Sequence, residues 1–335
     1  MNVPLTRIAG TMALRDPPVR PSLGRVRIPP GALVLAAAAA LTIAGVVERR
    51  AAPPARGAGV EVERQAARAE EIWITAERRI GAAKAAAGLP TDSSPLVGEE
   101  LTPLVTTLGS LKAKRAASRS AWAPTLTRKL AEKGVRHGSV VAASFSGSFP
   151  GLNLALAAAC QALGADLVAV SSVTASTWGA NQPGFTWPEM EALLVEAGEL
   201  RRVSAAISPG GMADNLLDLE PEARALALRI QRTTAQRLSA ACLNPAGLDE
   251  AVARRMAIYD DAARGRRIVL YANVGGSEVS LGSSAAVLRL RSGFLPDAPF
   301  DLGGGRGVMA RFAERGIPVL SLLNIEELAR RWSIE

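Results

Sequence analysis

Short apolar stretches that each end in a turn of small residues constrain the fold of this chain most. Residues 140–144, 203–207 and 268–272 are strand-like, and each is followed by serines or glycines and then by a helix-like segment. Strands that alternate with helices are typical of an α/β domain. We therefore expect a mainly parallel sheet with flanking helices over residues 89–335. Further strands are expected at 167–171 and 318–323, and further helices at 188–197, 221–241 and 248–263.

The turns after the first three strands contain residue types that suit anion binding. The carboxyl ends of parallel strands share one edge of the sheet, where helix N-termini present backbone N–H groups. We expect the turns to meet there, although their serines and glycines are also suited to shaping tight turns and capping helices. The candidate ligand-binding residues of the turns are Ser146, Gly147, Ser148, Ser208, Gly210, Gly211, Asn273, Gly275, Gly276 and Ser277, with Asp214 and Glu278 as the best placed carboxylates.

A serine nucleophile is a second interpretation of the first turn. Residues 144–148 resemble the nucleophile elbow of α/β-hydrolases, with Ser146 and Ser148 as candidate catalytic residues. The lone histidine, His137, precedes the same strand and should lie roughly 20 Å away at the opposite edge of the sheet. A Ser-His-Asp triad is therefore disfavoured, while help from a lysine or a carboxylate stays open. We expect no cofactor, and one histidine excludes the common zinc sites.

The positive charge of the chain is unevenly distributed. The net charge is +8, but eight arginines within residues 1–56 face only Asp16 and Glu48. Because little net charge is left for residues 57–335, we expect no nucleic-acid partner. Within 110–137, eight basic residues stand against Glu132 alone. This segment suits a polyanion, with Lys112, Lys114 and Arg115 as the first contacts, or it is a solvated helix face.

The N-terminal part predicts a membrane anchor. After a basic tail (1–30), residues 31–47 contain no charged side chain and are just long enough for a short span. Arginines directly after the span favour an anchor over a cleaved signal peptide. We expect a single-pass protein of the cell membrane with an extracytoplasmic main domain. A Pro/Gly linker (48–59) and an amphipathic helix (60–88) follow, and this helix either packs on the domain or forms a dimerising stalk.

Two smaller features complete the list of candidate residues. Trp178 and Asn181 lie in a loop that holds two of the five tryptophans, and they either wall a pocket or anchor the loop to the core. Cys160 lies in an apolar run and is expected to be a buried thiol, far in sequence from Cys242.

With these residues in view, the chain resembles the family of poly-gamma-glutamate system proteins. The resemblance rests on five stretches, at 106–115, 146–150, 175–181, 273–276 and 322–325, and Asn324 in the last stretch joins the candidate ligand-binding residues. The family places a histidine near Ser321, and its replacement here weakens any catalytic role at that position. The resemblance implies a membrane-associated role in poly-γ-glutamate synthesis or export and a ligand made of linked carboxylates.

Three functional hypotheses follow. The first is an accessory protein that binds poly-γ-glutamate, or another anionic polymer, at the strand-end loops. The second is a serine-dependent hydrolase or transferase that acts on γ-linked polyglutamate. The third is a scaffold that contacts components of the polymer synthase and has no affinity for the polymer.

Overall fold

The computed structural model describes residues 58–284, 290–295 and 307–334. The expected tail, membrane span and most of the linker therefore lie outside the described residues. Within the described ranges, no helix is both long enough and apolar enough to cross a membrane.

The elements alternate along the chain as the sequence predicts. The strands are β1 (Val105–Thr107), β2 (Val140–Phe145), β3 (Asp166–Ser172), β4 (Ala175–Ser176), β5 (Ser204–Ser208), β6 (Ala241–Cys242), β7 (Ile268–Val274), β8 (Gly293–Phe294) and β9 (Val319–Leu322). The helices are α2 (Ala58–Ala86), α3 (Leu111–Ala117), α4 (Trp122–Glu132), α5 (Pro150–Leu163), α6 (Trp187–Glu196), α7 (Pro221–Leu238), α8 (Leu248–Ala263), α9 (Glu278–Leu281), α10 (Val308–Glu314) and α11 (Ile325–Arg331), with a short 3-10 turn at Met212–Asp214.

Seven strands of the described part form one sheet in the order β6-β5-β3-β2-β7-β9-β8. All neighbours pair in parallel except β8, which runs antiparallel to β9. This confirms the expected α/β fold with a mainly parallel sheet. The chain begins the sheet at its centre with β2, builds outward to β6, and returns to place β7 on the other side of β2. Open α/β sheets bind ligands at such a reversal point, outside the carboxyl ends of the strands.

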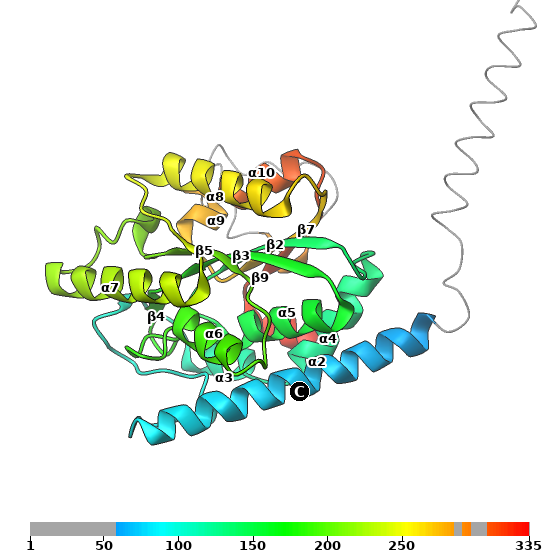
Figure 1. Ribbon diagram of the computed structural model, residues 1–335, viewed down its shortest axis with the longest axis horizontal. Coiled ribbons are helices and arrows are strands. Elements are labelled where there is room, and N and C mark those ends of the chain that lie inside the picture. The colour runs from blue at the N-terminus through cyan, green and yellow to red at the C-terminus, as the bar shows by residue number, and fades with distance from the viewer. Residues whose placement is uncertain (1–57, 285–289, 296–306, 335) are drawn as a thin grey trace, which may run out of the picture. The chain divides into compact units, whose positions relative to one another are not determined.

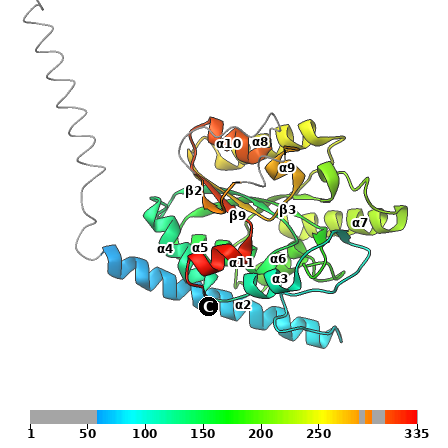
Figure 2. The same ribbon diagram turned by 180° about the vertical axis from the view of Figure 1, so that it is seen from behind.

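Helices cover both faces of the sheet, and this explains why its strands are apolar throughout. In Figures 1 and 2, α8 and α10 lie over one face, while α2, α4 and α5 lie on the other. Every residue of β2 is buried, and its side chains alternate between two hydrophobic clusters. A strand that is buried on both faces needs a continuous apolar run, because no side is left to water.

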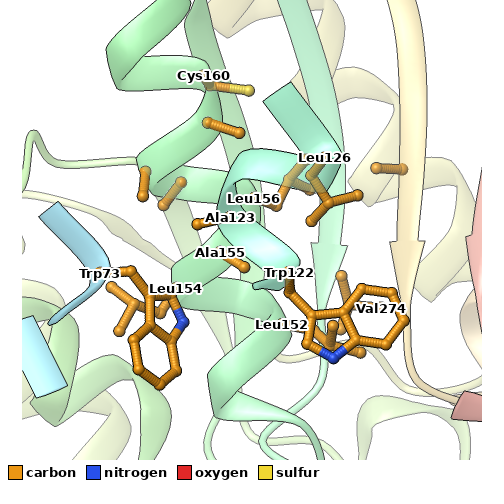
Figure 3. Close-up of a cluster of buried hydrophobic side chains, with 14 of the residues drawn as sticks. Trp73, Trp122, Ala123, Leu126, Leu152, Leu154, Ala155, Leu156, Cys160 and Val274 are labelled. Atoms are coloured by element: carbon orange, nitrogen blue, oxygen red, sulfur yellow. The ribbon is translucent and has the colours of Figure 1, made fainter. Parts of the chain in front are cut away.

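The amphipathic helix α2 packs on the domain, which is the first of its two predicted roles. Its buried stripe runs from Ala66 to Ile80, and it contacts α4 and α5. Figure 3 shows Trp73 of α2 and Trp122 of α4 on either side of α5, with Leu154 near Trp73, Leu152 near Trp122, and Cys160 farther along α5. Cys160 is buried as predicted, and burial raises the pKa of its thiol to about 12. The described residues from 58 onward belong to one compact unit that includes this helix.

Two buried tryptophans provide a matched test of this packing. The indole N–H of Trp73 donates a hydrogen bond to the carbonyl oxygen of Gly151 at 3.1 Å, whereas the indole nitrogen of Trp187 has no partner within the described residues. Trp73→Phe loses a hydrogen bond worth about 1 kcal/mol in addition to the change in volume, while Trp187→Phe loses volume alone. We expect Trp73→Phe to lower the free energy of unfolding more, as measured by urea denaturation. A larger loss for Trp187→Phe would contradict the packing described.

Candidate functional site

The turns after β2, β5 and β7 line a single cleft at the carboxyl edge of the sheet. Its volume is about 600 Å³. The first turn contributes Ser146 and Ser148, the second Gly210 and Gly211, and the third Gly276 and Ser277. The expected convergence of the three turns is therefore confirmed. The other wall comes from residues 106–110 and 174–176, where β1 and β4 form a separate two-stranded sheet.

Glycines allow the turns to approach one another closely. A Cβ atom on Gly147 would lie 2.7 Å from the carbonyl oxygen of Thr174. Gly275 has φ +93°, and a Cβ there would lie 2.7 Å from the Cβ of Ser146. The backbone N–H of Ser146 donates to the carbonyl oxygen of Val274, which joins the β2 turn to the end of β7. These glycines therefore hold the walls of the cleft in contact.

Lys114 of α3 is the one basic side chain that lines the cleft in the described part of the chain. The residue is 3% exposed. Its Nζ donates to the carbonyl oxygen of Ser148 at 2.5 Å and to Oγ of Ser176 at 2.7 Å, and it lies 3.8 Å from the ring centroid of Phe149. None of the ion pairs among the described residues involves Lys114. Burial lowers the pKa of its ammonium group to about 7, because the charged form loses its hydration without gaining a carboxylate.

A buried ion pair supports the floor of the cleft. Arg255 of α8 and Asp214 are both buried, and Nε of Arg255 donates to Oδ2 of Asp214 at 2.7 Å. The same guanidinium donates to Oγ of Ser208 and Oγ of Ser144. Ser208 is therefore buried within this network, below the cleft surface. The pair ties α8 to the ends of β2 and β5.

The loop after β5 is strained where it borders the cleft. Ala213, Asp214 and Leu216 have φ values of +50°, +59° and +60°, in the left-handed region that residues other than glycine rarely adopt. Each such residue costs on the order of 1 kcal/mol and persists only where surrounding contacts impose it. Here the N–H of Ala213 donates to Glu278, and Asp214 is held by Arg255. Strain of this kind is concentrated at ligand sites.

The other predicted basic contacts do not line this cleft. Lys112 pairs with Glu326 of α11 at 2.7 Å, and Arg115 pairs with Asp92 at 2.8 Å. Both side chains border a separate depression between α3 and α11, which lie side by side in Figure 2. The cleft itself has carboxylates from Asp214, Asp218 and Glu278. The described walls of the cleft therefore carry one lysine and three carboxylates, and two of the three basic residues expected to contact a polyanion, Lys112 and Arg115, lie outside it.

Four further candidate residues also lie outside the cleft lining. Trp178 lines a different depression beside residues 98–101, and the buried Asn181 exchanges hydrogen bonds with the backbone of Glu99. Asn273 is buried and donates to the carbonyl oxygen of Gly275, so it shapes the third turn from within. Asn324 precedes α11 in a left-handed conformation.

Sequence reasoning did not assign Ser176, which lies opposite the turns, to the site. Ser176 lies at the end of β4, and Gly109 lies just before α3. Both belong to stretches, 175–181 and 106–115, that also carry the family resemblance. Their place in the cleft depends on the pairing of β1 with β4, and these short strands have no apolar pattern that would predict it. The one signal in the sequence was the recurrence of serine and threonine in both stretches, which could have suggested that they share a site.

Comparison of the chain with family models, with curated proteins and with solved structures found no match.

Proposed function

We propose that this protein is a membrane-anchored accessory component of poly-γ-glutamate synthesis or export, which binds a carboxylate of the polymer in the cleft. The observation that carries the proposal is the placement of Lys114: a buried lysine, without a carboxylate partner among the described residues, at the meeting point of serine- and glycine-rich turns. A bound carboxylate would give the buried ammonium group of Lys114 the negatively charged partner that the described residues do not provide.

The charges of the cleft favour a limited contact with the polymer. Lys114 lies at one wall, while Asp218 and Glu278 lie along another. A long run of carboxylates would be repelled by these acidic groups, whereas one terminal or single residue can reach the lysine. We therefore propose recognition of one or two residues, such as a chain end. The membrane anchor, the extracytoplasmic domain and contacts with synthase components belong to the same proposal, supported by residues 31–47 and the family resemblance.

The proposal predicts that Lys114 controls the affinity. A γ-linked glutamate oligomer of defined length is titrated into the full-length chain by calorimetry at pH 6, where Lys114 is charged. Lys114→Met removes a charge-assisted hydrogen bond worth about 1.5–3 kcal/mol, so the affinity should fall roughly 10- to 150-fold. Lys112→Met changes an exposed residue outside the cleft and serves as the matched control, with less than a threefold change expected.

The pH dependence of the affinity provides a second readout. The affinity of the wild-type chain should fall as the pH rises through about 7, because Lys114 loses its proton there. Equal effects of Lys112→Met and Lys114→Met would contradict the proposal. A wild-type chain without affinity for the oligomer that still co-purifies with a synthase would favour the scaffold hypothesis.

A further inference from the structure

The structure places a candidate general base beside a serine, but this serine is neither Ser146 nor Ser148, the two that the sequence suggests as nucleophiles. The Oγ of Ser146 accepts a hydrogen bond from the N–H of Ser148, and the Oγ of Ser148 accepts one from the N–H of Ser176. Both hydroxyls thus brace the turn. His137 contacts Gly164 at the other edge of the sheet, where the N-terminal ends of β2 and β3 pair. Neither serine has a hydrogen-bonded base among the described residues.

Ser176 has such a base. Its Oγ lies 2.7 Å from Nζ of Lys114, within the cleft. The second hydrogen bond of Nζ, to the carbonyl oxygen of Ser148, fixes the direction of the amine. From this geometry we infer that Ser176 and Lys114 form a nucleophile and general-base pair for acyl transfer on an amide or ester carbonyl. The inference uses the same cleft as the proposed function but goes beyond it, because binding alone requires no nucleophile.

Gly109 leaves the space that the two side chains of the pair occupy. A Cβ atom on Gly109 would lie 2.8 Å from Oγ of Ser176 and 3.2 Å from Cε of Lys114. Any larger residue there would therefore crowd the pair. Gly109 is held in place by Thr177, which accepts from its N–H at 2.6 Å and donates to its carbonyl oxygen at 3.0 Å. The segments that carry the lysine and the serine are thus fastened together beside the reacting atoms.

The protonation state of Lys114 suits the role. With a pKa of about 7, roughly half of the lysine is the neutral amine at neutral pH, whereas an exposed lysine is almost fully charged. A general base works best when its pKa lies near the operating pH. Pairs of serine and lysine serve in this way in other hydrolytic enzymes. The absence of a carboxylate beside Nζ in the described structure fits this role, because such a partner would stabilise the ammonium form.

The reaction balances with water as the second substrate. The neutral amine of Lys114 takes the hydroxyl proton of Ser176 as Oγ bonds to the carbonyl carbon. The resulting ammonium returns that proton to the departing amine or alcohol as the original C–N or C–O bond breaks, which leaves an acyl ester on Ser176. Water then attacks this ester, gives a proton to Lys114, and releases the acid as the proton returns to Oγ of Ser176.

The test labels the full-length chain covalently with a fluorophosphonate and locates the adduct by peptide mapping. Hydrolysis of p-nitrophenyl acetate is measured separately on the unlabelled chain. We expect one adduct, on Ser176. Ser176→Ala should abolish the adduct, and Lys114→Met should slow labelling at least 100-fold. Lys114→Arg is the decisive variant, because arginine keeps the charge but does not lose its proton, so labelling should also be lost. Lys112→Met is the control and should label at the wild-type rate.

The pH profile separates catalysis from a structural role. The labelling rate of the wild-type chain should rise with pH around a midpoint near 7, as Lys114 becomes neutral. A folded wild-type chain that is not labelled, or that is labelled elsewhere, would overturn the inference. Polymer affinity is measured on the same preparations. Polymer affinity without labelling would overturn the assignment of Ser176 and Lys114 as nucleophile and base but leave the proposed function intact. Labelling without polymer affinity would support that assignment and contradict the proposed function.

Discussion

Replacing Arg255 by methionine is expected to lower the free energy of unfolding by about 3–5 kcal/mol. The change leaves the carboxylate of Asp214 buried at 1% exposure without its cation, and removal of one partner from a buried ion pair has a cost of this size. Urea denaturation of the full-length variant measures the loss. The same change should weaken ligand binding, because Asp214 belongs to the strained loop that borders the cleft.

The matched control for this prediction is Arg315→Met. Arg315 also pairs with an aspartate, Asp260, at 2.8 Å, but both side chains are more than two-fifths exposed. Exposed pairs contribute about 0–1 kcal/mol, so this variant should stay close to the wild-type stability. Similar losses for the two variants would show that Arg255 is not a buried partner of Asp214.

Lys114 should make the stability of the wild-type chain depend strongly on pH. Its pKa is about 7 in the folded protein and close to the ordinary 10.5 when unfolded. Between these values the unfolded chain binds more protons, so the free energy of unfolding rises with pH. Relative to Lys114→Met, the wild type should gain up to about 1.4 kcal/mol per pH unit, which amounts to about 4 kcal/mol between pH 6 and pH 10. Below pH 7 the difference between the two proteins should be constant.

Urea denaturation at pH 6, 8 and 10 tests this expectation. Lys84, whose pKa burial lowers to about 8, also titrates in this range, but it is present in both proteins and cancels in their difference. Lys112→Met, at an exposed position, should follow the wild type at every pH. A constant difference between wild type and Lys114→Met from pH 6 to pH 10 would mean that Lys114 titrates as an exposed lysine does.

The sequence was sufficient for the five longer strands of the main sheet and for the position of the cleft, but the two-residue edge strands β6 and β8 were not predicted. The strands expected at 140–144, 203–207 and 268–272 fall within one or two residues of β2, β5 and β7, because each apolar run is bounded by turn residues. Their turns meet because parallel strands place their carboxyl ends at one edge. The pairing of β1 with β4 was not predictable, because two- and three-residue strands leave no periodic pattern.

The electrostatics of the cleft required the three-dimensional structure. Lys114 is one of eight basic residues in 110–137, and only its contacts with Ser148 and Ser176 distinguish it from exposed neighbours. Arg255 was missed because an arginine in a helix such as α8 normally points to solvent. Trp178 was expected either to wall a pocket or to anchor its loop, and it borders a separate depression, because its backbone pairs with the 98–101 loop.

The most direct measurement of the central claim is the ¹⁵N resonance of the Lys114 amine, assigned by comparison with Lys114→Arg and followed by NMR through a pH titration. In the free protein the resonance should titrate near pH 7, and a saturating γ-linked glutamate trimer should move the midpoint upward, because a bound carboxylate stabilises the ammonium form. A midpoint near 10, or a midpoint near 7 that the trimer leaves unchanged, would contradict the assignment of this cleft as a carboxylate site.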